Sequence, residues 1–320
     1  MNIPPIIKKI CEELTVHEGY WHHAQFGSVA YISNLETLTQ FLYKTYYLGN
    51  IKSDTDSPPT ASQIRDHEDP IYTNTIISCI PYETYFSNGW NFFSKSKNGI
   101  TVEKQGLKLL VRDADIHENS EGNYILKMPA VRRYASLGYL TAYGEFGPAN
   151  PQQGIDRLYI NTTAKSADAV LSKTLEWASN AQTPITIKTA NSSSGYLRYD
   201  STVAYLPRTK FRQVRNHLIE ILQDQTIKIL NATPAFTASL APGIAWAEDP
   251  NSDGLGQLSF GMHRCRMTAG ALCKLNQDTI LQPQEWGAVI KREWAAQGFD
   301  LNTPHLSPKA TGAHLKGSSQ

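Results

Sequence analysis

The feature that most constrains the fold of this chain lies between residues 157 and 224. There, two segments with helical periodicity alternate with short segments of strand-like composition. Apolar residues after Ser166, and again after Pro207, recur at gaps of three and four, which places one apolar stripe along each of two helices. Between the helices, the segment 185–188 alternates isoleucine with threonine and Lys188, the period of a half-buried strand. The stretch therefore predicts strands covered by helices, with Lys188 on the strand face opposite the isoleucines.

The remainder of the chain predicts an α+β fold. Helical patterns follow Asn34 and Gln284, and strand-like patterns occupy 71–80, 99–112 and 123–133. We therefore expect helices followed by antiparallel strands in the N-terminal half, and a sheet with flanking helices in the C-terminal half.

Loop-forming composition marks the predicted domain boundaries. Residues 144–154 are rich in glycine and proline, so the chain divides into an N-terminal α+β region at 1–147 and a second α+β region at 148–300. The segment 301–320 contains small polar residues, proline and glycine but no aromatic residue, which predicts a flexible tail.

The charge balance and the cysteines exclude several classes of protein. With a net charge of +1, the chain lacks the basic excess of a dedicated nucleic-acid binder. No apolar segment is long enough to cross a membrane, and charged residues interrupt the segment 1–14, unlike a signal peptide. The four cysteines form no pair motif, which predicts a reduced, cytoplasmic protein. We expect neither nucleic acid nor a membrane as a partner.

Basic residues are concentrated in two places within this neutral chain. The segment 188–215 carries six basic residues against one acid, and 255–277 carries three against none. Such local surpluses indicate a small anionic ligand. The competing interpretation is that these residues form solvated helix faces, because exposed arginines are common. We predict that five arginines converge on one anion pocket: Arg157, Arg198, Arg208, Arg264 and Arg266.

Other kinds of site have weaker support. His17, His22, His23 and His67 lack the spacing of a zinc motif, and no Cys-x-x-Cys pair is present. The glycines match neither a dinucleotide fingerprint nor a phosphate-binding P-loop, and no serine lies in a nucleophile elbow. We therefore expect no metal and no cofactor.

The order of the motifs resembles a known family. Along the chain come Arg157-Leu-Tyr-Ile, a helix, Ile187-Lys188, Arg198, Tyr205, a basic helix and Ser259-Phe-Gly-Met-His-Arg-Cys-Arg. This order, together with the stretch Phe-Leu-Tyr-Lys-Thr-Tyr-Tyr-Leu-Gly at 41–49, resembles the HopA-type effector family first named from type III secretion. Relatives of that type accompany kinase-like proteins in ribosomal peptide pathways such as those of lanthipeptides and thioamitides. There they are implicated in making dehydroamino acids.

Over residues 157–266 the order is also similar, more distantly, to phosphothreonine lyases. That resemblance implies a lyase-like α/β sheet in the C-terminal half. It places Arg198 and Tyr205 among residues that face the phosphate, and Arg264 where a late arginine binds phosphate. Lys188 occupies the position of the base that removes the α-hydrogen.

One departure from the lyase pattern concerns the general acid. The lyases have Lys-x-His in the first strand of the site, whereas this chain has Arg157-Leu-Tyr159. Arg157 keeps the positive charge. Tyr159 either protonates the leaving oxygen or is a buried aromatic residue of a strand. We expect Tyr159 to lie beside Lys188, because their strands flank one helix.

These resemblances predict a metal-independent phospho-Ser/Thr lyase, which eliminates phosphate to leave a dehydroamino acid. The expected substrate is a ribosomal precursor peptide that a kinase-like protein of the same pathway has phosphorylated. Arginines suit the binding of the leaving phosphate, and a lysine of lowered pKa suits the removal of the α-hydrogen. The alternative is a non-catalytic effector or scaffold that binds a phosphopeptide or a leader peptide.

Overall fold

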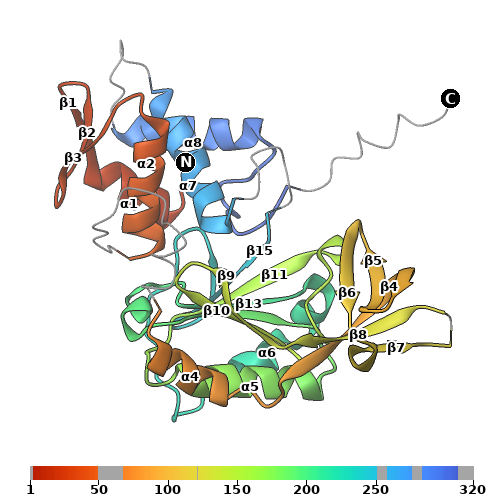
Figure 1. The fold of residues 1–320 in the computed structure, drawn as a ribbon. Coiled ribbons are helices and arrows are strands. Elements are labelled where there is room, and N and C mark those ends of the chain that lie inside the picture. Colours follow the sequence, from red (N-terminus) through yellow and green to blue (C-terminus); the bar gives the residue numbers. More distant parts are fainter. Residues whose placement is uncertain (1–2, 50–67, 121, 251–257, 276–282, 309–320) are drawn as a thin grey trace, which may run out of the picture.

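A seven-stranded antiparallel sheet separates two groups of helices in the computed structural model, as Figure 1 shows. The structure describes residues 3–49, 68–120, 122–250, 258–275 and 283–308, and within them the α+β fold class is confirmed. The strands lie in the order β14 (Ala238–Ala241), β15 (Ile244–Glu248), β11 (Ile155–Ile160), β13 (Thr202–Pro207), β12 (Thr186–Ala190), β10 (Tyr139–Tyr143) and β9 (Val131–Ser136).

Alternation of side chains along the central strands gives the sheet two different faces. On β11, Leu158 and Ile160 belong to one hydrophobic core, whereas Tyr159 belongs to the other. The first core is covered by α4 (Pro70–Ser78), α5 (Ala167–Asn180) and α6 (Arg208–Leu222). The helices predicted after Ser166 and Pro207 are therefore confirmed, and Ile187 faces them as expected.

The opposite face of the sheet packs against helices from both ends of the chain. These are α1 (Pro5–Glu13), α2 (Leu35–Leu42), α7 (Phe260–Cys273) and α8 (Pro283–Ala296). The predicted start of α2 is confirmed, because the side chain of Asn34 accepts a hydrogen bond from the Thr37 backbone N–H at 3.0 Å. A π-helical turn, η1 (Tyr43–Tyr47), follows directly on α2.

Two smaller antiparallel sheets complete the fold. One consists of β1 (Leu14–His17), β2 (Tyr20–His23) and β3 (Gly27–Tyr31). The other, at the right of Figure 1, has the order β6 (Leu107–Val111), β5 (Gly99–Lys104), β4 (Thr84–Ser96), β8 (Tyr124–Pro129) and β7 (Ile116–Glu118). The strands predicted at 99–112 and 123–133 are confirmed as β5 with β6 and as β8 with β9. Short 3-10 turns are η2 (Asp113–Asp115), η3 (Pro151–Gln153) and η4 (Ser193–Leu197).

The strand predicted at 71–80 is wrong, because most of this segment forms α4. Asp69 caps the helix by accepting hydrogen bonds from the backbone N–H groups of Ile71 and Tyr72, both at 3.0 Å. Pro70 occupies the first turn, where its missing N–H costs nothing. This Asp-Pro helix start outweighs the strand-like composition of the isoleucines that follow.

The cores do not divide at residue 147. Strands β9 and β10 precede this point, yet they belong to the same sheet as β11 to β15. Likewise, α1 and α2 pack against α8 and α7. Residues 301–308 of the predicted tail are part of the fold, because Leu301 is buried and Leu306 packs against a core, and residues 309–320 lie outside the described residues. No helix in the described parts of the chain has the length and apolarity to span a bilayer.

Candidate functional site

A cavity of about 170 Å³ lies on the sheet face opposite α5 and α6. It is lined by basic side chains, by tyrosines and by a small apolar surface that includes Leu137 and Val203. Five of the residues expected from the sequence line it: Arg157, Tyr159, Lys188, Arg198 and Tyr205. The structure therefore brings five of the eight predicted site residues together at one cavity.

Strand register explains why these side chains meet. In the ladder of β11, β13 and β12, Tyr159 is opposite Val203, which in turn is opposite Lys188. One step along the same face, Arg157 is opposite Tyr205. Directly opposed residues share a face of the sheet, as do residues two apart in one strand. Tyr159 and Lys188 thus share a face of the sheet and line the same cavity, but they are not the direct neighbours that we expected, because β13 lies between their strands.

Lys188 is the cation of the cavity that has no acidic partner among the described residues. Its Nζ lies 5.7 Å from the centroid of the Tyr205 ring, a cation–π contact. Burial lowers the pKa of Lys188, the nearby Arg157 guanidinium lowers it further, and Asp249 opposes the shift. A larger fraction of neutral amine is therefore present at a given pH than for an exposed lysine.

Both arginines of the cavity are paired with carboxylates. Arg157 donates its Nε–H to Asp249, and its guanidinium carbon lies 5.1 Å from the centroid of the Tyr205 ring. Arg198 donates two hydrogen bonds to Asp200, at 2.8 and 3.0 Å, in a bidentate pair. These ion pairs fix the two guanidinium groups at the cavity wall, and among the described residues they leave Lys188 as the cavity cation that no carboxylate contacts.

Tyrosines form much of the remaining wall. The hydroxyl of Tyr159 is buried and makes no well-formed hydrogen bond within the described residues. Burial raises the pKa of Tyr159 to about 12, although the Arg157 guanidinium opposes the shift, so the phenol keeps its proton near neutral pH. Tyr47 meets the Tyr159 ring edge-on, with centroids 6.2 Å apart, and stacks on Tyr43 at 5.1 Å.

The π-helical turn η1 and the start of α7 close the cavity opposite the sheet. A π-helical turn often occurs at a functional site, and here both ends of η1 contribute a lining tyrosine, Tyr43 and Tyr47. Gly261 permits the close approach of α7, because a Cβ atom at this position would lie 2.5 Å from the Tyr47 ring. Ser259 caps α7 and lines the cavity, so the positive end of the helix dipole is at the cavity wall.

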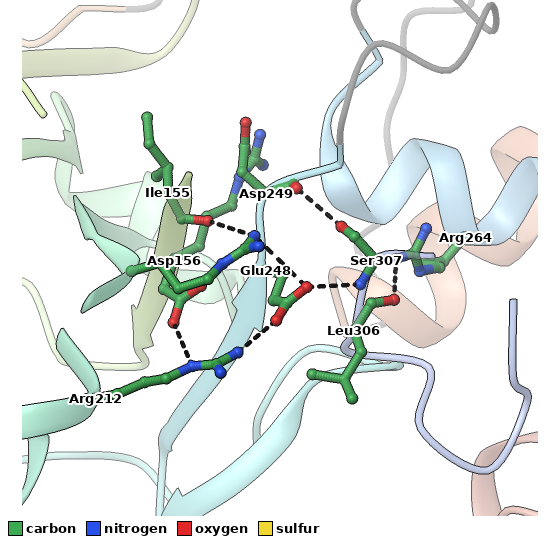
Figure 2. Close-up of polar contacts among 10 residues, drawn as sticks. Ile155, Asp156, Arg212, Glu248, Asp249, Arg264, Leu306 and Ser307 are labelled. Carbon is green, nitrogen blue, oxygen red and sulfur yellow. Dashed lines mark hydrogen bonds and ion pairs between the residues drawn. The ribbon is translucent and has the colours of Figure 1, made fainter. Parts of the chain in front are cut away.

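Arg208 and Arg266 do not reach the cavity, contrary to the prediction of a five-arginine pocket. Arg208 pairs with Asp156 at 3.0 Å and with Glu248 at 3.5 Å. Arg212 joins the same acidic pair, as Figure 2 shows for Asp156, Glu248 and Arg212. Arg266 pairs with Glu36 at 2.9 Å in a partly exposed contact. Both residues are therefore occupied by acids from distant parts of the chain.

Arg264 is a structural residue rather than a ligand of an anion. Its side chain is 0% exposed, and it donates hydrogen bonds to the backbone carbonyls of Pro304, at 2.7 Å, and Leu306, at 2.9 Å. The guanidinium carbon lies 4.4 Å from the centroid of the Phe299 ring and 4.9 Å from that of Phe260. The predicted phosphate contact of Arg264 is therefore wrong, because no ligand can reach the group.

The histidines provide no metal site in the part of the chain that the structure describes. No three side chains among its histidines, cysteines and acids lie close enough to hold an ion. His23 is buried, with Nε2 3.3 Å from the Glu13 carboxylate, whereas His17 is exposed. His67 lies outside the described residues.

Several lining residues were not identified from the sequence. Tyr43, Tyr47 and Ser259 lie within the two motifs that carry the family resemblance, at 41–49 and 259–266, but only the arginines of the second motif were assigned a role. Tyr139 donates to the Asp200 carboxylate at 3.3 Å and was not considered. The π-helical turn has no recognised sequence pattern that would have indicated these tyrosines.

A comparison with protein families confirms the resemblance that the motifs indicated. The model of the HopA1 effector protein family matches residues 130–306, more than half of the 320 residues. The solved structure of the effector protein from Pseudomonas syringae pv. syringae strain 61 is 12% identical, with a TM-score of 0.48, and the match covers 87% of this chain and 91% of that one. That of the effector protein from Pseudomonas syringae pv. tomato strain DC3000 is 15% identical, with a TM-score of 0.46 and coverage of 87% and 99%. No curated protein matches.

Proposed function

The chain belongs to the HopA1 effector protein family, and we propose that it removes phosphate from phosphorylated serine or threonine side chains by β-elimination. The observation that carries the proposal is the position of Lys188, a half-buried lysine that no carboxylate contacts among the described residues and that lines a small cavity together with Arg157. These surroundings favour its neutral form, which is the form that can remove a proton.

The size and charge of the cavity support a single phosphorylated side chain as its occupant. A volume of about 170 Å³ is well below the roughly 300 Å³ at which cavities for cofactors and drug-sized ligands begin. Lys188, Arg157 and Arg198 supply three positive charges, two of them already balanced by Asp249 and Asp200. The net attraction therefore favours an anionic group of small size.

The proposed reaction uses these side chains directly. The neutral amine of Lys188 takes the α-hydrogen, the electrons of the Cα–H bond form the Cα=Cβ double bond, and the Cβ–O bond breaks. Phosphate leaves with the bonding electrons, and Lys188 becomes an ammonium group. Arg157 and Arg198 stabilise the charge that develops on the leaving phosphate. Tyr159 keeps its proton and donates a hydrogen bond to a phosphate oxygen.

The substrate expected from the sequence is a ribosomal precursor peptide, and a kinase-like protein would supply its phosphoryl group. Both partners remain proposals. The chemistry demands only that a phosphate ester is formed before the chain acts, because elimination of an unphosphorylated hydroxyl would require a much poorer leaving group. Metal-free turnover is also part of the proposal, since cationic side chains supply the positive charge.

A second candidate function is binding of a phosphopeptide without turnover, as an effector or scaffold. The observation that favours it is the pairing of both cavity arginines with carboxylates, which reduces their availability to a transition state. The raised pKa of Tyr159 points the same way, because such a phenol is a weak general acid.

Mass spectrometry of a phosphorylated peptide separates the two functions. Elimination removes phosphoric acid and leaves a product that adds thiols, whereas hydrolysis leaves a hydroxyl group and binding changes nothing. In Lys188→Arg the charge is kept but the side chain stays protonated, so a folded variant should bind phosphopeptide and eliminate nothing. Lys210→Arg, on the exposed face of α6, is the matched control. Substantial elimination by Lys188→Arg would overturn the role of Lys188, and absence of both binding and turnover in the unmodified chain would overturn both functions.

A further inference from the structure

The chain segment that follows α8 returns to the edge of the cavity region, where residues 304–308 form what we call the strap. The backbone N–H of Glu248, at the end of β15, donates to the carbonyl of His305 at 2.8 Å. Ser307 donates its N–H to the Glu248 carboxylate and its hydroxyl to the Asp249 carbonyl, both at 3.0 Å. Figure 2 shows the two contacts of Ser307, which join the strap to the acids Glu248 and Asp249 at the end of β15.

Arg264 and the core hold the strap in place from the other side. The two hydrogen bonds from the Arg264 guanidinium to the carbonyls of Pro304 and Leu306 fix the strap backbone to α7. The His305 ring lies 5.0 Å from the Trp246 ring, and Leu306 packs against a hydrophobic core. Ser307 is therefore presented to Asp249 in one orientation.

Asp249 is fixed by two backbone contacts and by its side chain. Its N–H donates to the Ile155 carbonyl at 2.8 Å, which ties it to β11, and its carbonyl accepts from Ser307. Its carboxylate accepts the hydrogen bond from Arg157 Nε, and Arg157 lines the cavity next to Lys188. A continuous series of hydrogen bonds thus runs from the strap to the cavity wall.

We infer that Ser307 and Asp249 are positioning residues, through which the strap holds the Arg157 guanidinium at the place where the cavity receives phosphate. Neither residue lines the cavity. The expected effect of Ser307 and Asp249 on turnover rests on the proposed function, whereas their expected effect on the binding of an anion does not depend on it. The opposite interpretation is that Asp249 masks Arg157 and competes with an anion.

Three variants of the full chain test the inference, with inorganic phosphate as the probe in isothermal titration. Ser307→Ala should weaken phosphate binding about tenfold, the effect of losing one hydrogen bond that orders a charged group, and Ser307→Thr should restore it because the hydroxyl is kept. Asp249→Asn should weaken binding as well. Ser239→Ala is the matched control, since it removes an exposed hydroxyl that contacts the Ala241 carbonyl on β14 and makes no hydrogen bond with the strap among the described residues.

Each result decides the question. Unchanged phosphate affinity in Ser307→Ala, with the fold intact by circular dichroism, would overturn the inference, and tighter binding by Asp249→Asn would establish the masking interpretation instead. If Asp249→Asn does not fold, the comparison of Ser307→Ala with Ser307→Thr still decides whether the strap positions Arg157. Where the unmodified chain eliminates phosphate, Ser307→Ala should lower kcat with KM changed less, and Ser307→Thr should recover it. Absence of turnover in every chain would remove the proposed function alone, because phosphate affinity is measured separately.

Discussion

Arg264→Met tests whether this arginine holds the strap or binds a ligand. Methionine keeps an unbranched apolar side chain of similar length between Phe260 and Phe299, but it removes the guanidinium that donates to Pro304 and Leu306. The substitution therefore removes the charge and the hydrogen bonds of the guanidinium, including its contact with His263, and keeps an apolar side chain between the two rings.

The expected cost follows from the two carbonyls that lose their donor. A buried acceptor left unsatisfied costs about 1–3 kcal/mol, and the lower part of this range applies because Pro304 and Leu306 are only half-buried. Relief of the desolvation of a buried guanidinium offsets some of the loss. Two acceptors at about 1–2 kcal/mol each give about 2–4 kcal/mol, and with this offset we expect Arg264→Met to lower the free energy of unfolding by about 1–3 kcal/mol.

Urea unfolding provides the measurement, since a fall in the midpoint at unchanged slope reports a loss of stability. Arg266→Met is the matched control two residues away, because its ion pair with Glu36 is partly exposed and such pairs contribute about 0–1 kcal/mol. A stability of Arg264→Met within about 0.5 kcal/mol of the unmodified chain, together with lost phosphate binding, would refute the structural role.

Three further predictions concern individual groups. Tyr159→Phe should lower turnover roughly ten- to hundredfold, as expected for one hydrogen bond to a charged group, whereas a loss beyond about a thousandfold in steady-state kinetics would make Tyr159 the general acid. The rate of elimination should rise with pH as Lys188 loses its proton. Burial, and then the Arg157 guanidinium, lower the pKa of Lys188, so the rise in a pH–rate profile should be centred below the pKa range of an ordinary lysine. A rise centred within that range would contradict the role of Lys188 as the base. Burial raises the pKa of Asp156 to about 6, so the folded state binds more protons than the unfolded state between about pH 4 and 6. The free energy of unfolding should therefore fall as pH rises through this window. Urea unfolding of Asp156→Asn at several pH values should lack this contribution to the pH dependence.

The parts of the fold that depend on local periodicity were predictable from the sequence. The spacing of apolar residues predicts the helices α5 and α6, and the alternation in β12 places Lys188 and Ile187 on opposite faces of the sheet. These patterns act within a few residues, so no knowledge of the rest of the chain is required. The helix α4 was misjudged because the isoleucines were given more weight than the Asp69 cap.

The partners of the arginines were not predictable in the same way. A basic surplus within one segment indicates an anion, but it does not reveal whether the anion is a ligand or an acid from elsewhere in the chain. Here Asp156 and Glu248 neutralise Arg208, and backbone carbonyls from the strap satisfy Arg264. Only the fold brings these groups together, so the interpretation based on counting charges overestimated the number of arginines that line the cavity.

The position of the cavity between the two ends of the chain has a consequence for folding. Tyr43 and Tyr47 come from near its start, Ser259 from near its end, and the strands between them form the floor. Contacts between residues so distant in sequence carry a large entropic cost before they contribute stability, and they form slowly. The cavity needs groups from the sheet, from η1 and from the start of α7, so we expect it to form only when these elements have packed together. Phosphate binding should accordingly report that η1 and α7 have packed against the sheet, and not only that the strands have paired.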